Sequence, residues 1–228
     1  MQVHRTENKF IISLAEARQL MARLDQIMPR DIHSLGPDGY EIRSLYFDTL
    51  GDRSCVEKAD GLQVHEKIRA RIYGTDDTVI KLESKYKNGE HQTKKTMLIS
   101  RPLMEELAQG EYSGLLSSDD PMAPYFYKKL SGAMQPRSIV QYRRVSFNLD
   151  TNNTRITFDY DIRTTECCFD LFQEPLLACP ILPPDKVVLE VKFNNFLLGY
   201  IQRALQGIRR SPVSYSKYFI GRRFCRTM

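Results

Sequence analysis

Residues 67–99, KIRARIYGTDDTVIKLESKYKNGEHQTKKTMLI, decide the fold of this chain. Charged and apolar side chains alternate along most of this stretch, which is typical of β-strands with two different faces. Asn88-Gly89 is a strong signal for a type I′ hairpin turn, and residues 74–78 form a longer polar turn. The stretch therefore predicts three antiparallel strands.

The predicted Asn88-Gly89 loop fixes the register of the second and third strands. It places Lys87 opposite Glu90, Lys85 opposite Gln92, Glu83 opposite Lys94 and Lys81 opposite Thr96. One face then carries Lys67, Arg69, Arg71, Lys81, Lys85, Lys87 and Lys94 against Glu83 and Glu90, and the other carries Ile68, Ala70, Ile72, Ile80, Leu82, Tyr86 and Leu98. Like charges that face each other destabilise a sheet, so this excess of cations favours a bound polyanion. A charged face exposed to solvent explains this stretch equally well.

Composition limits the classes of protein to consider. The chain has 228 residues, of which 42% are hydrophobic and 27% charged, and this predicts one globular domain over residues 1–228. The net charge of +5 favours anionic partners. Five cysteines without C-x-x-C spacing and four scattered histidines argue against zinc. The N-terminus has no apolar signal region and no apolar run is long enough to span a membrane, so we expect a soluble cytoplasmic protein.

The same two-faced pattern recurs outside the central stretch. Further strands are predicted at residues 4–12, 41–49, 138–149, 155–162 and 186–193, and helices at residues 13–28, 100–110, 121–132, 195–207 and after Pro212. Residues 50–61 are expected to be a polar connection and residues 169–184 irregular. The predicted fold class is α+β, mainly antiparallel β: an eight-stranded closed barrel with peripheral helices and a basic lumen.

An ordered set of short motifs adds a resemblance to a known family. The motifs are Arg5-x-Glu7-x-Lys9, Tyr46-Phe47-Asp48-Thr49, Arg69-x-Arg71, Glu83-x-Lys85, Lys94, Tyr142-x-Arg144, Arg155, Leu189-Glu190-Val191-Lys192 and Ser216-Lys217-Tyr218. In this order they resemble the VTC domain, the polyphosphate polymerase domain of the vacuolar transporter chaperone complex, in the CYTH or triphosphate tunnel superfamily. The resemblance covers nearly the whole chain. It implies a tunnel in which basic residues hold ATP and a growing polyphosphate, with a divalent metal, Mn²⁺ or Mg²⁺, on a carboxylate.

Carried over position by position, the resemblance implies roles for eleven residues. Arg69, Arg71, Lys85, Arg144 and Glu190 would be catalytic, with Glu190 as the metal ligand, and Lys9, Lys94, Tyr142, Arg155, Ser216 and Lys217 would bind substrate. The register argument selects Lys94 over Lys95 and Arg144 over Arg143 independently of the family. Lys67, Lys81 and Lys87 are expected at the tunnel mouths. Asp159 and Asp161 are expected to balance Arg155, with assistance to a metal as the alternative.

The implied activity is transfer of the ATP γ-phosphate to pyrophosphate or polyphosphate, with no nucleic-acid partner and with any membrane partner left open. A triphosphate hydrolase is the alternative within the fold. Hydrolytic members tend to begin E-x-E-x-K, whereas this chain has Arg5 at the first position and Lys192 two residues after Glu190. Both substitutions remove carboxylates that could hold a second metal. A non-catalytic polyanion-binding module is the third possibility, although the charged faces offer little aromatic stacking surface beyond Tyr142.

Overall fold

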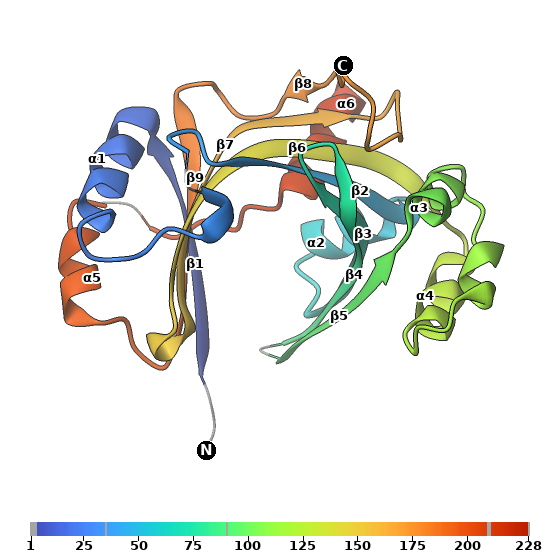
Figure 1. Ribbon diagram of the computed structural model, residues 1–228, viewed down its shortest axis with the longest axis horizontal. Helices are drawn as coiled ribbons and strands as arrows, with labels where there is room; N and C mark the ends of the chain where they lie inside the picture. Colours follow the sequence, from blue (N-terminus) through green and yellow to red (C-terminus); the bar gives the residue numbers. More distant parts are fainter. Residues whose placement is uncertain (1–3, 35, 90, 209–210, 228) are drawn as a thin grey trace. The chain divides into compact units, whose positions relative to one another are not determined.

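The computed structural model describes residues 4–34, 36–89, 91–208 and 211–227, and antiparallel strands dominate it (Figure 1). The strands are β1 (Arg5–Ser13), β2 (Tyr40–Thr49), β3 (Val64–Tyr73), β4 (Asp76–Asn88), β5 (His91–Ile99), β6 (Met134–Leu149), β7 (Thr154–Thr165), β8 (Cys179–Pro180) and β9 (Lys186–Asn194). The α-helices are α1 (Leu14–Leu24), α2 (Arg53–Ala59), α3 (Arg101–Ala108), α4 (Ala123–Leu130), α5 (Gly199–Ala204) and α6 (Lys217–Thr227). Short 3-10 helices are η1 (Ile32–Ser34), η2 (Ser113–Ser117) and η3 (Thr151–Asn153).

The sheet is open in the part of the chain that the structure describes. Its strand order is β1-β9-β7-β6-β2-β3-β4-β5, with the two-residue β8 beside β7. β1 pairs only with β9 and β5 only with β4, so the hydrogen-bonded ladder ends at these two strands. The α+β class and the antiparallel sheet are confirmed, whereas the closed eight-stranded barrel is not. Closure would need a further ladder of backbone hydrogen bonds between the first and last strands.

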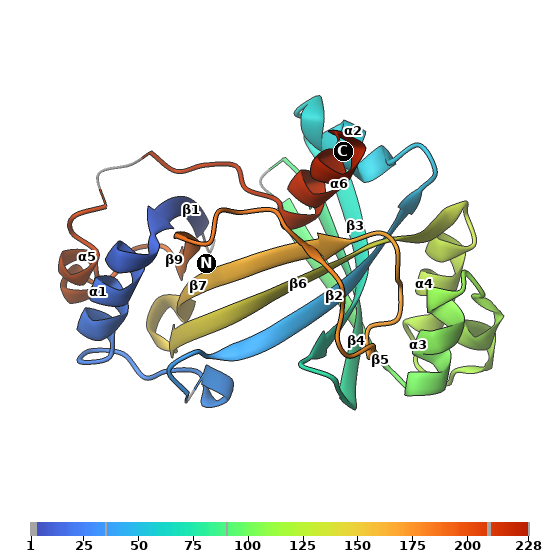
Figure 2. The same cartoon turned by 90° about the horizontal axis from the view of Figure 1, so that it is seen from above.

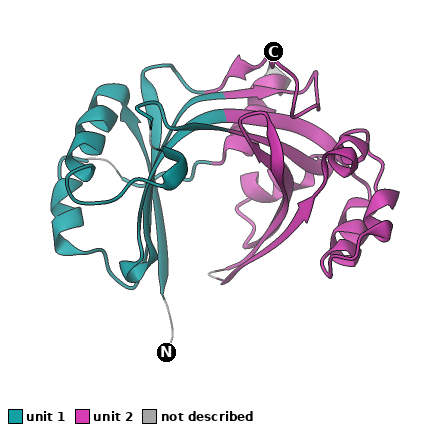
Figure 3. Ribbon diagram, viewed as in Figure 1, with its two compact units in different colours: residues 1–41, 142–162, 182–215 teal, residues 42–141, 163–181, 216–228 magenta. Residues whose placement is uncertain are grey.

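The chain divides into two compact units, and β6 and β7 run through both (Figure 3). Unit 1 comprises residues 1–41, 142–162 and 182–215, and unit 2 comprises residues 42–141, 163–181 and 216–228. Each unit has its own hydrophobic core. None of the helices in the described ranges combines the length and the apolar character that a bilayer-crossing segment needs.

Unit 1 buries one face of its strands under two helices. Ser13 begins α1 with the predicted capping box: its hydroxyl accepts from the Glu16 backbone N–H, and the Glu16 carboxylate accepts from the Ser13 N–H. α1 and α5 lie side by side in both views (Figures 1 and 2). Their apolar side chains pack on alternate residues of β1 and β9, such as Ile12 and Leu189. The intervening residues of these strands therefore point to the opposite face.

Unit 2 repeats this arrangement with β2, β3, β4 and β5. Ile68, Ala70 and Leu82 are completely buried against residues of α3, η2 and α4. α3 and α4 lie side by side in Figures 1 and 2. The prediction that Leu98 belongs to this apolar face is wrong, because Leu98 lies opposite Lys81 and is 63% exposed.

The hairpin register differs from the prediction by two residues. Asn88 continues β4 and pairs with His91, so Glu83 lies opposite Thr96 and Lys85 opposite Lys94. Gly89 supplies the positive φ of +59° that the turn needs, whereas Asn88 does not take the left-handed conformation that a turn centred on Asn88-Gly89 requires. Because the shift is an even number of residues, the faces stay as predicted, apart from that of Leu98, although the partners change. The predicted partner Glu90 lies outside the described residues.

Several element boundaries also differ from the prediction. Residues 50–61 contain the helix α2, and α1 and α5 are shorter than the helices predicted at residues 13–28 and 195–207. α2 begins where the buried Asp48 carboxylate accepts hydrogen bonds from the backbone N–H groups of Thr49 and Ser54. A carboxylate at a helix N-terminus is stabilising, but local sequence does not show that this one is buried there.

A buried ion-pair network attaches α6 to the rest of unit 2. Both oxygens of the Asp52 carboxylate accept from Arg222, at 3.0 Å from Nε and 2.6 Å from Nη2. Arg222 also pairs with Glu166, and Arg137 Nε lies 3.3 Å from the Asp52 carboxylate. Asp52 is completely buried, so its charge depends on these arginine partners.

Replacing Asp52 with Ala is expected to destabilise the protein by about 3–5 kcal/mol, because the buried Arg222 guanidinium loses its main counter-charge. Denaturant unfolding followed by circular dichroism measures this loss. Asp77→Ala is the matched control, since Asp77 pairs with Arg101 on the surface and should leave the unfolding midpoint unchanged. Equal midpoints for the two variants would contradict this account of α6.

Candidate functional site

The charged face of unit 2 carries adjacent lysines in one cross-strand row. Lys67 on β3 lies opposite Lys85 on β4, and Lys85 lies opposite Lys94 on β5. Directly opposite side chains of an antiparallel pair share a face at close range, so like charges here repel one another. The sheet therefore holds three positive charges side by side.

Glu83 organises the neighbouring cations of the same face. Its carboxylate lies 2.9 Å from Arg69 Nε, 3.6 Å from Arg71 Nε and 2.5 Å from Lys94 Nζ. The Glu83 side chain is only 3% exposed. Burial alone would raise the pKa of Glu83, but the charges of Arg69 and Lys94 outweigh it and hold this pKa below its ordinary value. Glu83 is thus an ionised carboxylate that fixes three cations.

The C-terminal segment of unit 2 adds polar groups to this face. Ser216 lies just before α6, and its hydroxyl accepts from Lys67 Nζ at 2.9 Å. Tyr218 stacks on Tyr46 with ring centroids 4.7 Å apart. The Tyr46 hydroxyl accepts in turn from Arg69 Nη1 at 3.0 Å. The start of α6 therefore positions Ser216 directly and supports Arg69 through the two stacked rings.

The charged face of unit 1 alternates acids and bases on β1 and β9. Lys9 lies opposite Glu190, and Glu7 lies opposite Lys192. Lys9 Nζ lies 3.1 Å from the Glu7 carboxylate and 3.8 Å from that of Glu190, and Lys192 pairs with both carboxylates. Burial would raise the pKa of Glu190, but Lys192 and Lys9 more than offset this and lower it. Burial would likewise lower the pKa of Lys9, yet the Glu190 and Glu7 carboxylates raise it.

Arginines from β6 and β7 complete the face of unit 1. Arg144 makes a two-pronged ion pair with the completely buried Asp159 carboxylate, at 2.6 Å and 2.8 Å. Its guanidinium also lies over the Tyr142 ring, 5.3 Å from the centroid. Arg155 Nε donates to the Ser146 hydroxyl at 3.2 Å. The geometry holds both guanidinium groups in fixed orientations.

The residues around Glu190 fit a divalent ion with few protein ligands. Glu190 and Glu7 supply carboxylate oxygens, which Mg²⁺ and Mn²⁺ prefer, and both contact the same two lysines. Within the described ranges, no three His, Cys, Asp or Glu side chains come together as a metal-binding group. Such an ion would therefore take most of its ligands from phosphate oxygens, as Mg²⁺ commonly does.

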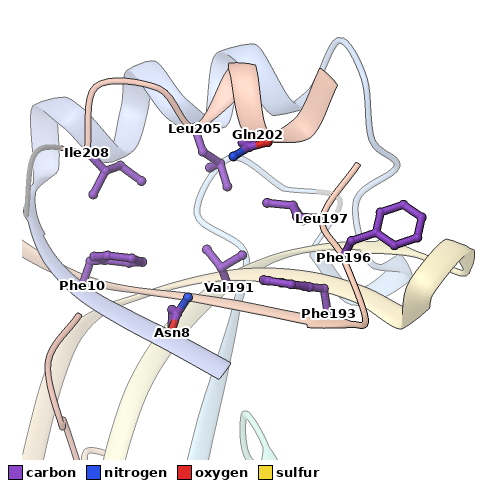
Figure 4. Close-up of a pocket in the computed structure, with 9 residues that line it drawn as sticks. All are labelled: Asn8, Phe10, Val191, Phe193, Phe196, Leu197, Gln202, Leu205 and Ile208. Atoms are coloured by element: carbon purple, nitrogen blue, oxygen red, sulfur yellow. The ribbon is translucent and has the colours of Figure 1, made fainter. Parts of the chain in front are cut away.

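An apolar pocket of about 550 Å³ lies on the other side of β1 and β9 (Figure 4). Its lining residues are Asn8, Phe10, Val191, Phe193, Phe196, Leu197, Gln202, Leu205 and Ile208. Asn8 and Val191 alternate with Lys9 and Glu190 along their strands, so the pocket and the charged cluster occupy opposite faces. Among the residues that the structure describes, no charged side chain lines this pocket, so this lining offers phosphate no cation.

The structure groups the predicted site residues by unit. Lys9, Tyr142, Arg144, Arg155 and Glu190 lie in unit 1, and Arg69, Arg71, Lys85, Lys94, Ser216 and Lys217 lie in unit 2. Lys94 lies with Glu83 on the charged face, whereas Lys95 lies over the Tyr125 ring. The prediction that Asp159 balances Arg155 is wrong, since both carboxylate oxygens of Asp159 bind Arg144.

Sequence reasoning missed two supporting contacts. Tyr46 is buried, and its hydroxyl accepts a hydrogen bond from Arg69, a contact that strand alternation does not reveal. The Arg144 partner was missed because strand alternation gives a residue's face but not which neighbour its side chain reaches.

The chain matches a known protein family along nearly its whole length. The model of the VTC domain family matches residues 4–225. The chain belongs to the VTC domain family. No curated protein sequence matches it.

Solved structures with the same fold share little sequence with this VTC domain. A presumed adenylate cyclase from Bacillus halodurans matches with a TM-score of 0.53 and 12% identity, covering 95% of this chain and 96% of that one. A presumed adenylate cyclase from Vibrio parahaemolyticus matches with a TM-score of 0.48 and 10% identity, over 95% and 97% of the two chains. The Bacillus match supports the fold alone.

The depressed pKa of Glu83 predicts a pH-dependent contribution to stability. A carboxylate whose folded pKa is lowered stabilises the fold above its unfolded pKa, about 4.3, and this stability is lost as the pH falls through the folded value. Glu83→Gln should therefore lower Tm at about pH 7, and the difference from the unsubstituted protein should shrink at about pH 3. Thermal unfolding at both pH values measures this. Glu105→Gln is the control, because Glu105 pairs with Arg101 on the surface; a Tm difference for Glu83→Gln that did not change with pH would contradict the role of Glu83.

Proposed function

We propose that this VTC domain is a metal-dependent polyphosphate polymerase that transfers the ATP γ-phosphate to a growing polyphosphate chain. The observation that carries the proposal is the row of Lys67, Lys85 and Lys94 beside the Glu83-bound arginines. Adjacent like charges repel one another, and an anion bound along this row would relieve the repulsion. A polyphosphate chain carries a negative charge on each phosphate, so one chain could neutralise several of these cations at once. The membership in the VTC family supports this substrate class.

The proposed chemistry depends on positioning and electrostatics. In phosphoryl transfer, charge is spread over the oxygens of the transferred group, and fixed cations stabilise it. Arg69 and Arg144 offer planar guanidinium forks, held by Glu83 and Asp159. Lys85 and Lys94 in unit 2, and Lys9 in unit 1, would add point charges that attract phosphate oxygens. The terminal phosphate of the chain is already ionised when it attacks, so no strong general base is required.

The proposed metal would be Mn²⁺ or Mg²⁺, held by Glu190 with Glu7 beside it. When bound, it would neutralise part of the triphosphate charge and help to align the reacting phosphates. The protein's own part at this position is to present the two carboxylates on adjacent strands and to keep Lys9 and Lys192 next to them.

The position of Lys192 favours transfer to a phosphate chain over hydrolysis. Its ammonium group pairs with both Glu7 and Glu190, at a place where a further carboxylate could help to hold a second, water-activating metal. A triphosphate hydrolase remains the alternative function. The fold shared with the presumed adenylate cyclase is compatible with either, since a cyclase also acts on a nucleoside triphosphate.

The decisive assay incubates the protein with ATP, Mn²⁺ and a pyrophosphate primer and separates the products on a gel that resolves polyphosphate from orthophosphate. We expect a polyphosphate ladder, and a loss of about 100-fold in its rate of formation for Arg144→Ala, because one fixed donor to the transferred phosphate is removed. Arg143→Ala is the matched control. Arg143 is the exposed neighbour of Arg144 on the opposite face of β6, and its Nε donates to the Asp38 carbonyl, so the rate should not change.

Two further variants separate catalysis from folding and from binding. Lys94→Ala removes a cation that is 55% exposed, so it should slow the reaction without unfolding the protein. Glu190→Gln should abolish turnover while ATP still binds, as measured by calorimetry. Orthophosphate as the only product would establish the hydrolase, and binding without any metal-dependent product would establish a binding module.

A further inference from the structure

Two buried hydroxyl groups on the charged face of unit 1 have no hydrogen-bond partner within the described residues: Thr157 Oγ1 and the Tyr215 hydroxyl. Thr157 is 3% exposed and Tyr215 is 7% exposed. A buried polar group that makes no hydrogen bond costs free energy, and in native proteins such groups are uncommon. Neither residue is among those assigned a role from the sequence.

Thr157 lies in the same cross-strand row as two predicted site residues. On β7 it is directly opposite Glu190 of β9, which is in turn opposite Lys9 of β1. Along β7 its neighbours on the same face are Arg155 and Asp159. The Thr157 hydroxyl therefore lies within the cationic cluster and not in the apolar core.

Tyr215 reaches the same face from the segment that runs along the outer edge of β1. The Val213 N–H donates to the Lys9 carbonyl at 2.7 Å, and Lys9 Nζ donates to the Tyr215 carbonyl at 3.2 Å. Burial, with a contribution from the Asp159 charge, raises the pKa of Tyr215 to about 12. At neutral pH the Tyr215 hydroxyl therefore keeps its proton and can donate it in a hydrogen bond.

We propose that the hydroxyl groups of Thr157 and Tyr215 donate hydrogen bonds to phosphate oxygens on the charged face of unit 1, and that both are substrate-binding residues. This inference rests on the proposed function. A phosphate oxygen accepts hydrogen bonds without donating one, which suits two neutral donors whose carboxylate neighbours are already bound by Lys9, Lys192 and Arg144. These donors would add contacts without adding positive charge to the face.

The test is calorimetric titration of the full chain with inorganic tripolyphosphate. Tyr215→Phe and Thr157→Val should each weaken binding about tenfold, as expected for a lost hydrogen bond to a charged acceptor. Their Tm should stay the same or rise, because each change removes a buried polar atom that has no partner. Tyr112→Phe is the matched control: its hydroxyl donates to the Met134 carbonyl at 2.7 Å in unit 2, so Tm should fall and affinity should not change.

Three results would count against the proposal in distinguishable ways. Unchanged affinity in both Tyr215→Phe and Thr157→Val would overturn it while leaving the proposed function intact. A fall in Tm like that of Tyr112→Phe would show that the two hydroxyls stabilise the fold. This result would also overturn the proposal. If the unsubstituted protein failed to bind tripolyphosphate, the proposed function would fail, and the assignment of the two hydroxyls with it.

Discussion

Buried carboxylates that each bind several cations are the interaction on which both charged faces depend. Glu83 holds Arg69, Arg71 and Lys94, and Asp159 holds Arg144 in a two-pronged pair. Each strand packs its apolar residues under helices, so its charged residues must share the remaining face at a spacing set by the backbone. Cations at that spacing repel one another. A carboxylate among them compensates for part of this repulsion and keeps each side chain in one position.

The same compensation has a functional consequence. The single Glu83 carboxylate contacts three cations, Arg69, Arg71 and Lys94, so this group keeps a net positive charge. Guanidinium groups held on one side by a carboxylate can still present their remaining N–H donors to an anion. Such prepositioned donors lose little conformational entropy when the anion binds. This VTC domain can therefore hold several cations in fixed positions and still be stable without a bound anion.

The C-terminal segment contributes to each unit in turn. In unit 1, Val213 binds the edge of β1, and Tyr215 follows it onto the charged face. In unit 2, Ser216 contacts Lys67, and Arg222 fixes α6 through the buried Asp52 carboxylate. Backbone hydrogen bonds and buried ion pairs thus replace a strand ladder in holding this segment.

The sequence by itself determined the strands, their two faces and which cations share a face, because side-chain alternation with a period of two survives even the two-residue error in the β4–β5 register. The family motifs identified the same cations. Only the tertiary structure decided that the described sheet is open, that residues 53–59 form α2, and that Asp159 pairs with Arg144 and not with Arg155. It also decided that Thr157 and Tyr215 are buried without partners. These features depend on contacts between residues far apart in the chain, such as Asp52 with Arg222, and local periodicity carries no information about such contacts.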